Sequence, residues 1–295
     1  VWGMFSWLAH MGSDPRDLVK DLRAMNDASF QRAYQLSEYL RNPEYADLRR
    51  DEELAGELVD LLQEQLTEGR FDKRRIDMRI YLCRALGEFE LIFVAEVLTE
   101  AATLERDPKE IDVRRSAIEG LATLAGHVGA EKIRSDEEVM KALLDASRER
   151  EASGESQDRD AIRSTAAYAL GVIGGDESRE RLHQLQVDSN PNVRFNAATG
   201  LARHCDVRCL PVLVDMLDPD SETGIAEDLK DGLRVRQKLA ILTNAIFAAA
   251  RMVDAPKGDD LGLLENALQK LIDSDKPRAI RVKAKEALIV VRRRK

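Results

Sequence analysis

The sequence is poor in cysteine and in aromatic residues. Only three of its 295 residues are cysteine, and 5% are aromatic. An odd number of cysteines in a chain of this length argues against a disulfide framework and fits a reducing compartment. Alternating runs of Val, Thr and Tyr are nearly absent, which argues against a large β-sheet.

The motifs that commonly mark an active site are also absent. The chain has no phosphate-binding G-x-x-x-x-G-K-[ST] loop and no G-x-S-x-G nucleophile turn. The glycines of 171–175 follow an expected helix and not a strand, so they are interpreted as a helix end. We therefore expect no enzymatic activity and no cofactor.

One group of soft metal ligands needs separate consideration. His204, Cys205 and Cys209 lie close together in the sequence, and His183 or Asp206 could add a fourth ligand. A structural zinc site needs four ligands, and no second cysteine pair completes this one. Cysteine at a helix-to-helix turn is more often a small core residue, so we expect no metal site.

Charge is abundant but mixed in sign. The chain carries 54 acidic and 45 basic residues, for a formal net charge of -9. Coating a nucleic acid needs a concentrated Lys/Arg surface, and here both signs are interspersed. The charges are therefore interpreted as solvated helical faces, and nucleic acid is not expected as a partner.

A short pattern recurs along the chain. An apolar residue precedes an arginine, and further apolar residues follow the arginine at three and about seven positions. This spacing predicts a helix that is buried along one side. The recurrent arginines are Arg79, Arg114, Arg163, Arg194, Arg236 and Arg281.

A second predicted helix follows each of these helices, so the repeated unit is helix, turn, helix. The second helices are predicted at 52–66, 91–104, 136–148, 177–187, 209–217 and 261–272. Polar stretches at 149–160 and 219–232 are predicted to be surface loops. No single pair can bury its apolar face, so stacking of neighbouring pairs must build the core.

Local signals mark several helix ends. Ser135 with Glu138 predicts a capping box, and Asn190 before Pro191 predicts an N-cap followed by proline. Asp14 before Pro15 gives the same signal near the N-terminus. Left-handed caps are predicted at the glycines that follow the first helices, namely Gly87, Gly171, Gly174 and Gly175.

These observations predict an all-α fold, a right-handed α-α superhelix of about six to seven helix pairs. Three parts are expected: a hydrophobic N-terminal segment at 1–13, a helical cap with a degenerate repeat at 14–71, and the repeat array at 72–295.

Three stretches carry a family resemblance. DVRRSAIEGLATLAG, RDAIRSTAAYALGVIGG and NPNVRFNAATGLARH resemble HEAT repeats, most closely the short subtype first noted in phycocyanobilin lyases. The resemblance covers 72–293 well and 15–71 weakly. It implies a HEAT/armadillo-like solenoid, in which the recurrent arginine bonds an aspartate or a carbonyl in a neighbouring turn. The paired His-Glu motifs of the HEAT enzyme deoxyhypusine hydroxylase are absent, because none of the four histidines precedes a glutamate.

The first eleven residues, VWGMFSWLAHM, are too few to span a bilayer. Two interpretations stay open: the end of a membrane helix whose start lies upstream, or a hydrophobic helix that caps the first repeat. Trp7-Leu8-Ala9 followed by Asp14-Pro15-Arg16 resembles membrane-tethered bacterial HEAT-repeat proteins. That resemblance implies a membrane anchor and a location on the cytoplasmic side.

Because fold and function separate readily, the resemblance does not name an activity. The first hypothesis is a scaffold that binds a protein partner through the concave face formed by the second helices. The second is a bilin-lyase-like enzyme or enzyme subunit, which would need a deep apolar pocket. The candidate partner-binding residues are Arg179, Arg181, Gln184, Arg208 and Asp215.

Overall fold

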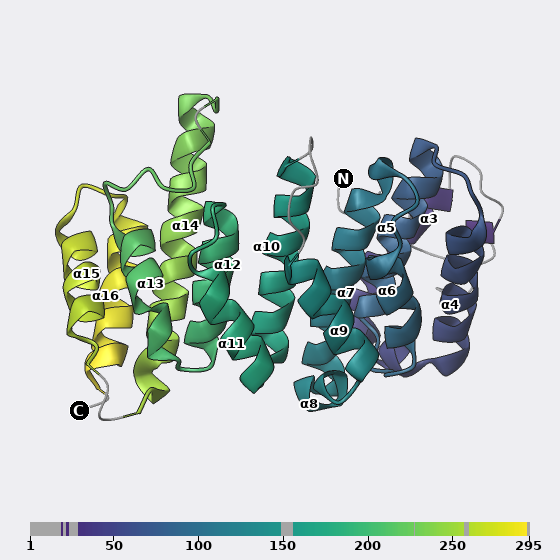
Figure 1. Ribbon diagram of the computed structural model, residues 1–295, viewed down its shortest axis with the longest axis horizontal. Helices are drawn as coiled ribbons and strands as arrows, with labels where there is room; N and C mark the ends of the chain where they lie inside the picture. The colour runs from purple at the N-terminus through teal and green to yellow at the C-terminus, as the bar shows by residue number, and fades with distance from the viewer. Residues whose placement is uncertain are drawn as a thin grey trace, which may run out of the picture. The chain divides into compact units, whose positions relative to one another are not determined.

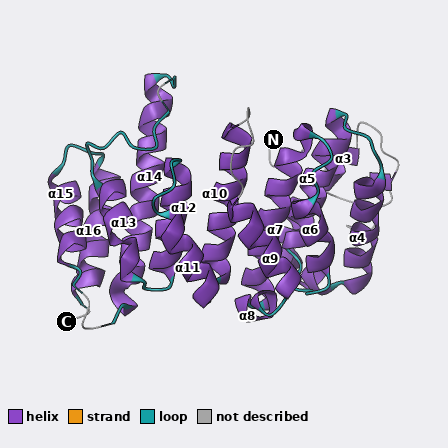
Figure 2. Ribbon diagram, viewed as in Figure 1, coloured by secondary structure: helices purple, strands orange, loops and turns teal. Residues whose placement is uncertain are grey.

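The computed structural model describes residues 19, 22–23, 29–148, 156–226, 228–256 and 260–293 (Figure 1). Within these ranges every regular element is a helix, and none of them contains a strand (Figure 2). The chain divides into two compact units, Val1–Ala146 and Ser147–Lys295. Each unit is built from antiparallel helix pairs, which confirms the predicted all-α fold of HEAT/armadillo-like pairs. The predicted three-part organisation stays a prediction.

Unit 1 places its first helices side by side. Helix α3 packs on α5, and α5 packs on α7, while α4 and α6 lie against them. The shared core is aliphatic, with Leu40, Leu58, Leu82 and Leu121 fully buried. The elements of unit 1 are α3 (Ser29–Arg41), η1 (Pro43–Arg50), α4 (Glu52–Thr67), α5 (Lys73–Gly87), α6 (Val94–Thr103), η2 (Pro108–Glu110), α7 (Ile111–Val128), α8 (Ala130–Arg134) and α9 (Glu137–Arg148), the last of which runs into unit 2.

Unit 2 repeats this arrangement. Helix α10 packs on α12, α12 on α14, and α14 on α16, with α11, α13 and α15 as the second helices. The elements of unit 2 are α10 (Ser156–Ile173), α11 (Asp176–Leu185), α12 (Pro191–Arg203), η3 (Val207–Cys209), α13 (Leu210–Leu217), α14 (Asp231–Arg251), η4 (Met252–Asp254), α15 (Gly262–Asp273) and α16 (Arg278–Arg292). All six predicted second helices are confirmed to within a few residues at each end.

The recurrent arginines tie each first helix to neighbouring turns, as the family resemblance implies. Arg79 is fully buried and donates to the carbonyls of Glu68 and Arg70, and its guanidinium also bonds Glu110. Arg114 donates to the carbonyl of Ala102 at 3.0 Å. Because a buried guanidinium needs several partners, these contacts fix the turns that precede α5 and α7.

The same contacts recur in unit 2 around one aspartate. Arg163 of α10 bonds both carboxylate oxygens of Asp188 at 3.0 Å, and Arg194 of α12 donates to the carbonyl of Asp188 at 2.7 Å. Asp188 therefore joins two successive first helices, which is the repeat-to-repeat role predicted for these arginines.

The prediction was wrong for Arg236 and Arg281, which are both exposed. In α14 the buried cation is Lys238, two residues further on, and its Nζ donates to the carbonyls of Asp218 and Ser221. The first turns of α14 rise beyond the neighbouring helices of unit 2 (Figure 1), which leaves Val235 and Arg236 in solvent. In α14 the buried cation of the repeat is therefore a lysine, and it lies two residues later than the pattern predicts.

The predicted loop at 219–232 is confirmed at 219–226 and 228–230, and α14 begins at Asp231. Gln237 donates to the carbonyl of Gly224 at 2.7 Å and Arg234 to that of Ala226 at 3.0 Å, so α14 holds this loop. In the other predicted loop, residues 149–155 lie outside the described residues, and α10 already begins at Ser156. Residues 156–160 of this predicted loop are therefore helical.

Two of the three predicted caps can be compared with the structure. Asn190 caps α12 as expected, accepting from the backbone N–H groups of Asn192 and Val193. Before α9 the capping side chain is Asp136 and not Ser135, because Asp136 Oδ1 accepts from Glu138 and Val139. The Ser135 hydroxyl instead donates to the carbonyl of Lys132, in the turn before it. The Asp14 cap lies outside the described residues.

The glycine prediction is half correct. Gly174 and Gly175 have positive φ angles of 68° and 91° at the end of α10. Gly87 is the last residue of α5 and Gly171 lies in the last turn of α10, and they face Gly120 and Gly200 of the neighbouring first helix. A Cβ on either would lie 2.6 Å from the Cα of its partner glycine. These two glycines therefore allow close helix approach and are not left-handed caps.

Candidate protein-binding site

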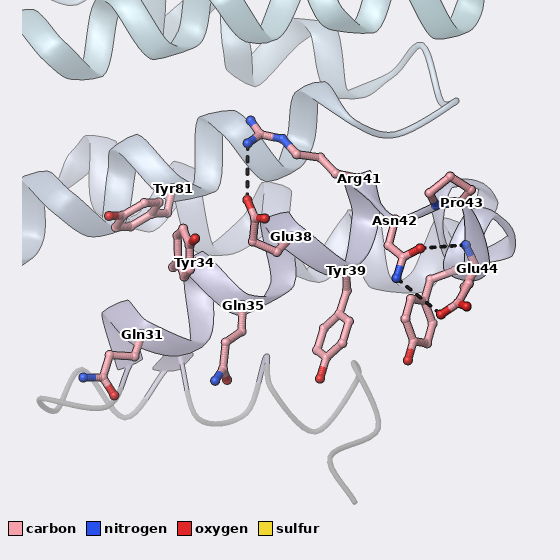
Figure 3. Close-up of a pocket in the computed structure, with 11 residues that line it drawn as sticks. Gln31, Tyr34, Gln35, Glu38, Tyr39, Arg41, Asn42, Pro43, Glu44 and Tyr81 are labelled. Atoms are coloured by element: carbon pink, nitrogen blue, oxygen red, sulfur yellow. Dashed lines mark hydrogen bonds and ion pairs between the residues drawn. The ribbon is translucent and has the colours of Figure 1, made fainter. Parts of the chain in front are cut away.

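A pocket of about 1080 Å³ opens on unit 1, and tyrosines dominate its wall (Figure 3). Four of the five tyrosines in the chain line it. They come from three elements: Tyr34 and Tyr39 from α3, Tyr45 from η1 and Tyr81 from α5. The remaining lining residues are Gln31, Gln35, Glu38, Arg41, Asn42, Pro43 and Glu44.

The local fold explains why these rings face outward. Helix α3 buries Ala33, Leu36 and Leu40 against the rest of unit 1, and side chains on its opposite side, such as Tyr34, are exposed. Figure 3 shows Gln31, Gln35 and Tyr39 projecting from one side of α3. After α3, the Asn42 side chain accepts from the N–H of Glu44 at 3.0 Å, and Pro43 opens η1. This turn brings Tyr45 back toward Tyr39.

The four rings form two edge-to-face pairs. Tyr34 and Tyr81 have centroids 5.8 Å apart, and Tyr39 and Tyr45 have centroids 5.0 Å apart. Such contacts hold the rings in place, yet Tyr34 remains 50% exposed and Tyr45 38%. None of the four phenol hydroxyls bonds to another residue in the part of the chain that the structure describes. The site thus offers paired aromatic rings whose hydroxyls have no partner among the described residues.

The polar side chains around the pocket differ in how closely they bond to their neighbours. Arg41 bonds Glu88 at 2.8 Å and Glu38 at 3.4 Å, and the bond to Glu88 is the main reason that the pKa of Arg41 is raised. Asn42 contacts Glu44 weakly, at 3.5 Å. Among the described residues, the lining contains no histidine, cysteine, serine or lysine. This set of residues suits binding through stacking and hydrogen bonds better than nucleophilic or acid–base chemistry.

The candidate residues predicted from the sequence lie in unit 2 and do not line this pocket. Arg181 donates to the hydroxyl of Ser147 at 2.8 Å and to its carbonyl at 2.6 Å, and it also bonds Gln184. Arg179 bonds Asp176, its own neighbour on α11. Several of the predicted contact residues are therefore engaged in contacts within the chain.

Arg208 and Asp215 are engaged in the same way. Arg208 bonds Asp206 at 2.7 Å and Glu180 at 2.9 Å, and these two hydrogen bonds raise its pKa. Asp215 accepts from the hydroxyl of Ser221 at 3.0 Å. The role of all five residues as a partner site stays a prediction.

The histidine and cysteine residues 204, 205 and 209 each make a separate contact with another part of unit 2. His204 Nε2 lies 2.9 Å from the carbonyl oxygen of Gly171, and Cys205 Sγ lies 3.3 Å from that of Arg251. Cys209 is buried, its Sγ lies 3.8 Å from Met252 Sδ, and burial raises the pKa of its thiol to about 12. Among the described residues, no group of three or more His, Cys, Asp or Glu residues could hold a metal ion.

Sequence reasoning missed the tyrosine pocket. A signal was available, since Tyr34, Tyr39 and Tyr45 lie within twelve residues of a chain that has only five tyrosines. The contribution of Tyr81 could not be predicted, because it depends on the packing of α5 against α3.

Comparisons with known proteins agree with this architecture, in which stacked helix pairs define an α-solenoid repeat protein. Residues 150–234 match the HEAT repeat family. No significant match was found among curated protein sequences. The family match thus concerns the middle of the chain, and helix pairs of the same kind lie before and after it.

Solved structures with a similar fold cover nearly the whole chain. The complex of CpcE and CpcF of phycocyanin lyase from Nostoc is 16% identical, with a TM-score of 0.51, and the match covers 96% of this chain and 97% of that one. An archaeal HEAT-like repeats protein from Thermococcus onnurineus is 14% identical, with a TM-score of 0.48 and coverage of 96% and 98%. A designed armadillo repeat protein is 18% identical, with a TM-score of 0.38 and coverage of 87% and 98%. At such identities these likenesses concern the fold alone.

Proposed function

We propose that this chain is a HEAT-repeat scaffold that binds a segment of a protein partner and is not itself an enzyme. The tyrosine pocket of unit 1 is its contact site. The observation that carries this proposal is the gathering of four of the five tyrosines around one pocket, with partly exposed rings.

Physical chemistry supports a peptide as the ligand. Tyrosine supplies a large, stiff contact area with a polar end, and it is enriched among the residues that dominate binding energies. The free phenol hydroxyls and the amides of Gln31 and Gln35 can bond the carbonyl and N–H groups of a peptide backbone. An extended segment laid across the two ring pairs would bury both of them.

Selection of peptides tests the proposal. The intact chain is used to select from a random peptide library, and the affinity of the selected peptides is measured by fluorescence anisotropy. Tyr34→Ala and Tyr39→Ala should weaken binding by about tenfold or more, since truncation of a central anchor typically costs at least 2 kcal/mol. Tyr34→Phe keeps the ring pair and removes only the hydroxyl, so its loss should be smaller.

Phe93 provides the matched control. It is an aromatic residue of unit 1 that does not line the pocket and is 44% exposed, so Phe93→Ala should leave the affinity unchanged. The proposal fails if no peptide is selected above background, or if the selected peptides bind the Tyr34 and Tyr39 variants as tightly as the wild type.

The alternative is a bilin-lyase-like enzyme or enzyme subunit. It is supported by the fold likeness to the phycocyanin lyase complex and by the volume of the pocket, which is at the upper end of those that hold small ligands. Titration with free bilin distinguishes the two functions. A shifted and saturable bilin absorbance that is lost in Tyr39→Ala would favour the enzyme.

Membrane tethering is a separate proposal that concerns residues 1–13. None of the described helices combines the length and apolar character of a membrane span. Fractionation of cells that express the complete reading frame tests the proposal. Recovery in the membrane pellet after a high-salt wash supports an anchor, and recovery in the supernatant contradicts it.

A further inference from the structure

Three first helices of unit 2 bring cations and an aromatic ring to one edge. Tyr168 belongs to α10, Arg203 is the last residue of α12, and Arg251 is the last residue of α14. The Arg203 guanidinium lies 5.9 Å from the centroid of the Tyr168 ring. Cys205, two residues after Arg203, has its Sγ 3.3 Å from the carbonyl oxygen of Arg251. These contacts place the two arginines at neighbouring ends of packed helices.

Several cations of unit 2 bond a carboxylate within the chain. Arg163 bonds Asp188, Arg208 bonds Asp206, and Arg292 bonds Glu265, each within 3.0 Å. Arg203 and Arg251 bond neither a carboxylate nor a carbonyl in the described part of the chain, and they lie close enough for the charge of Arg251 to act on Arg203.

Arg203 is also partly removed from water. Burial is the main cause of a lowered pKa for its guanidinium, Tyr168 opposes that change, and the charge of Arg251 adds to it. Its guanidinium has therefore lost part of its hydration, although the side chain is still partly exposed. An anion brought to this edge would meet donors that have already lost part of their hydration.

A second ring and cation extend the same side of unit 2. Phe247 lies one helical turn before Arg251 on α14 and is 55% exposed. Lys283 of α16 lies with its Nζ 5.3 Å from the centroid of that ring. Exposed aromatic surface thus adjoins the unpaired cations, which suits a segment with acidic and apolar side chains.

We propose that Tyr168, Arg203 and Arg251 form a second binding site, which takes a carboxylate-bearing segment of a protein partner. The planar fork of arginine matches a carboxylate in two parallel hydrogen bonds. Nucleic acid is disfavoured because the net negative charge repels a long polyanion and because each ring already has a cation over it. This inference goes beyond the tyrosine pocket and stands independently of it.

The test uses the intact chain and a labelled glutamate-rich peptide with a central leucine, compared with the same peptide carrying glutamine in place of glutamate. The glutamate peptide should bind and the glutamine peptide should not. Arg203→Gln and Arg251→Gln should each weaken binding by about tenfold or more, because each removes a charge-assisted pair. Arg203→Lys keeps the charge but loses the fork, so an intermediate loss is expected.

Arg236 is the matched control. It is an exposed arginine on the same helix as Arg251, fifteen residues or about 22 Å away along the axis, and Arg236→Gln should bind as the wild type does. Circular dichroism of each variant checks that it is folded. The proposal is overturned if both peptides bind equally, if the Arg203 and Arg251 variants bind as the wild type does, or if single-stranded DNA binds this edge in preference to the glutamate peptide.

Discussion

Buried charges in unit 1 form a compact cluster around one carboxylate. Glu110 is 3% exposed and bonds Arg79 at 2.6 Å, and it also accepts from Arg106. The ring of Phe71 lies 5.7 Å from the Arg79 guanidinium and 5.2 Å from that of Arg106. Removing Glu110 would leave two guanidinium groups without their shared counter-charge, one of them in the core.

Glu110→Gln should therefore be strongly destabilising. Breaking a buried ion pair by removing one partner typically costs about 3–5 kcal/mol, because an uncompensated charge remains. The free energy of unfolding from urea denaturation measures the effect. Asp77→Asn provides a control, since it breaks the exposed pair with Lys73, which should contribute at most about 1 kcal/mol. Equal effects of the two substitutions would contradict the assignment of Glu110 as the centre of the cluster.

Lys238 gives the corresponding prediction for unit 2. Its ammonium group is buried and holds the loop before α14 through two carbonyls. Lys238→Met keeps the aliphatic stem but leaves both acceptors unpaired, which should cost about 1–3 kcal/mol. Thermal denaturation compares it with Arg236→Gln, which should lie within about 0.5 kcal/mol of the wild type. If Arg236→Gln is the more harmful variant, the register described for α14 is wrong.

At the scale of helices, paired glycines set the distance between successive first helices. Gly171 of α10 faces Gly200 of α12, and Gly87 of α5 faces Gly120 of α7. Neither pair leaves room for a side chain, although Gly120, Gly171 and Gly200 lie within helices, where alanine would otherwise be preferred. The glycines are kept at the expense of helix propensity because the neighbouring backbone is so near.

Gly171→Ala should consequently destabilise the protein. The added methyl group would force α10 and α12 apart, at a cost of about 1–3 kcal/mol. Gly126→Ala is the control, because nothing lies within 4 Å of the position of its Cβ. That variant should be neutral or more stable by up to about 1 kcal/mol. The midpoints of thermal unfolding of the two variants are compared with that of the wild type. A stabilising effect of Gly171→Ala would refute the close-packing explanation.

The helices themselves could be predicted from the sequence, whereas the side-chain contacts could be predicted only in part. Arg79, Arg114, Arg163 and Arg194 are placed correctly, because each follows a buried apolar residue at fixed spacing. Arg236 fits the same pattern, yet it falls in turns of α14 that rise beyond the neighbouring helices.

The roles of certain glycines and tyrosines also could not be predicted from the sequence. A local pattern cannot distinguish a glycine that ends a helix from one that admits a neighbouring helix, as at Gly171. The tyrosine pocket needs α5 beside α3, and that is tertiary information. Residues within one helix are therefore predictable here, and sites assembled from several helices are not.

At the scale of the whole molecule, two compact units offer surfaces of different chemistry. Unit 1 presents ring pairs beside the carboxylates of Glu38 and Glu44, and unit 2 presents the unpaired Arg203 and Arg251. Solenoid proteins bind extended partners through many modest contacts, so more than one site along a chain is in keeping with the architecture.

Hydrogen–deuterium exchange of the intact chain, with and without a peptide selected as described above, tests the central claim most directly. A peptide held by the tyrosine pocket should slow exchange in 29–50 and 73–87, the segments that carry Tyr34, Tyr39, Tyr45 and Tyr81. Protection confined to other segments, with these two unchanged, would contradict the assignment of this pocket as the binding site.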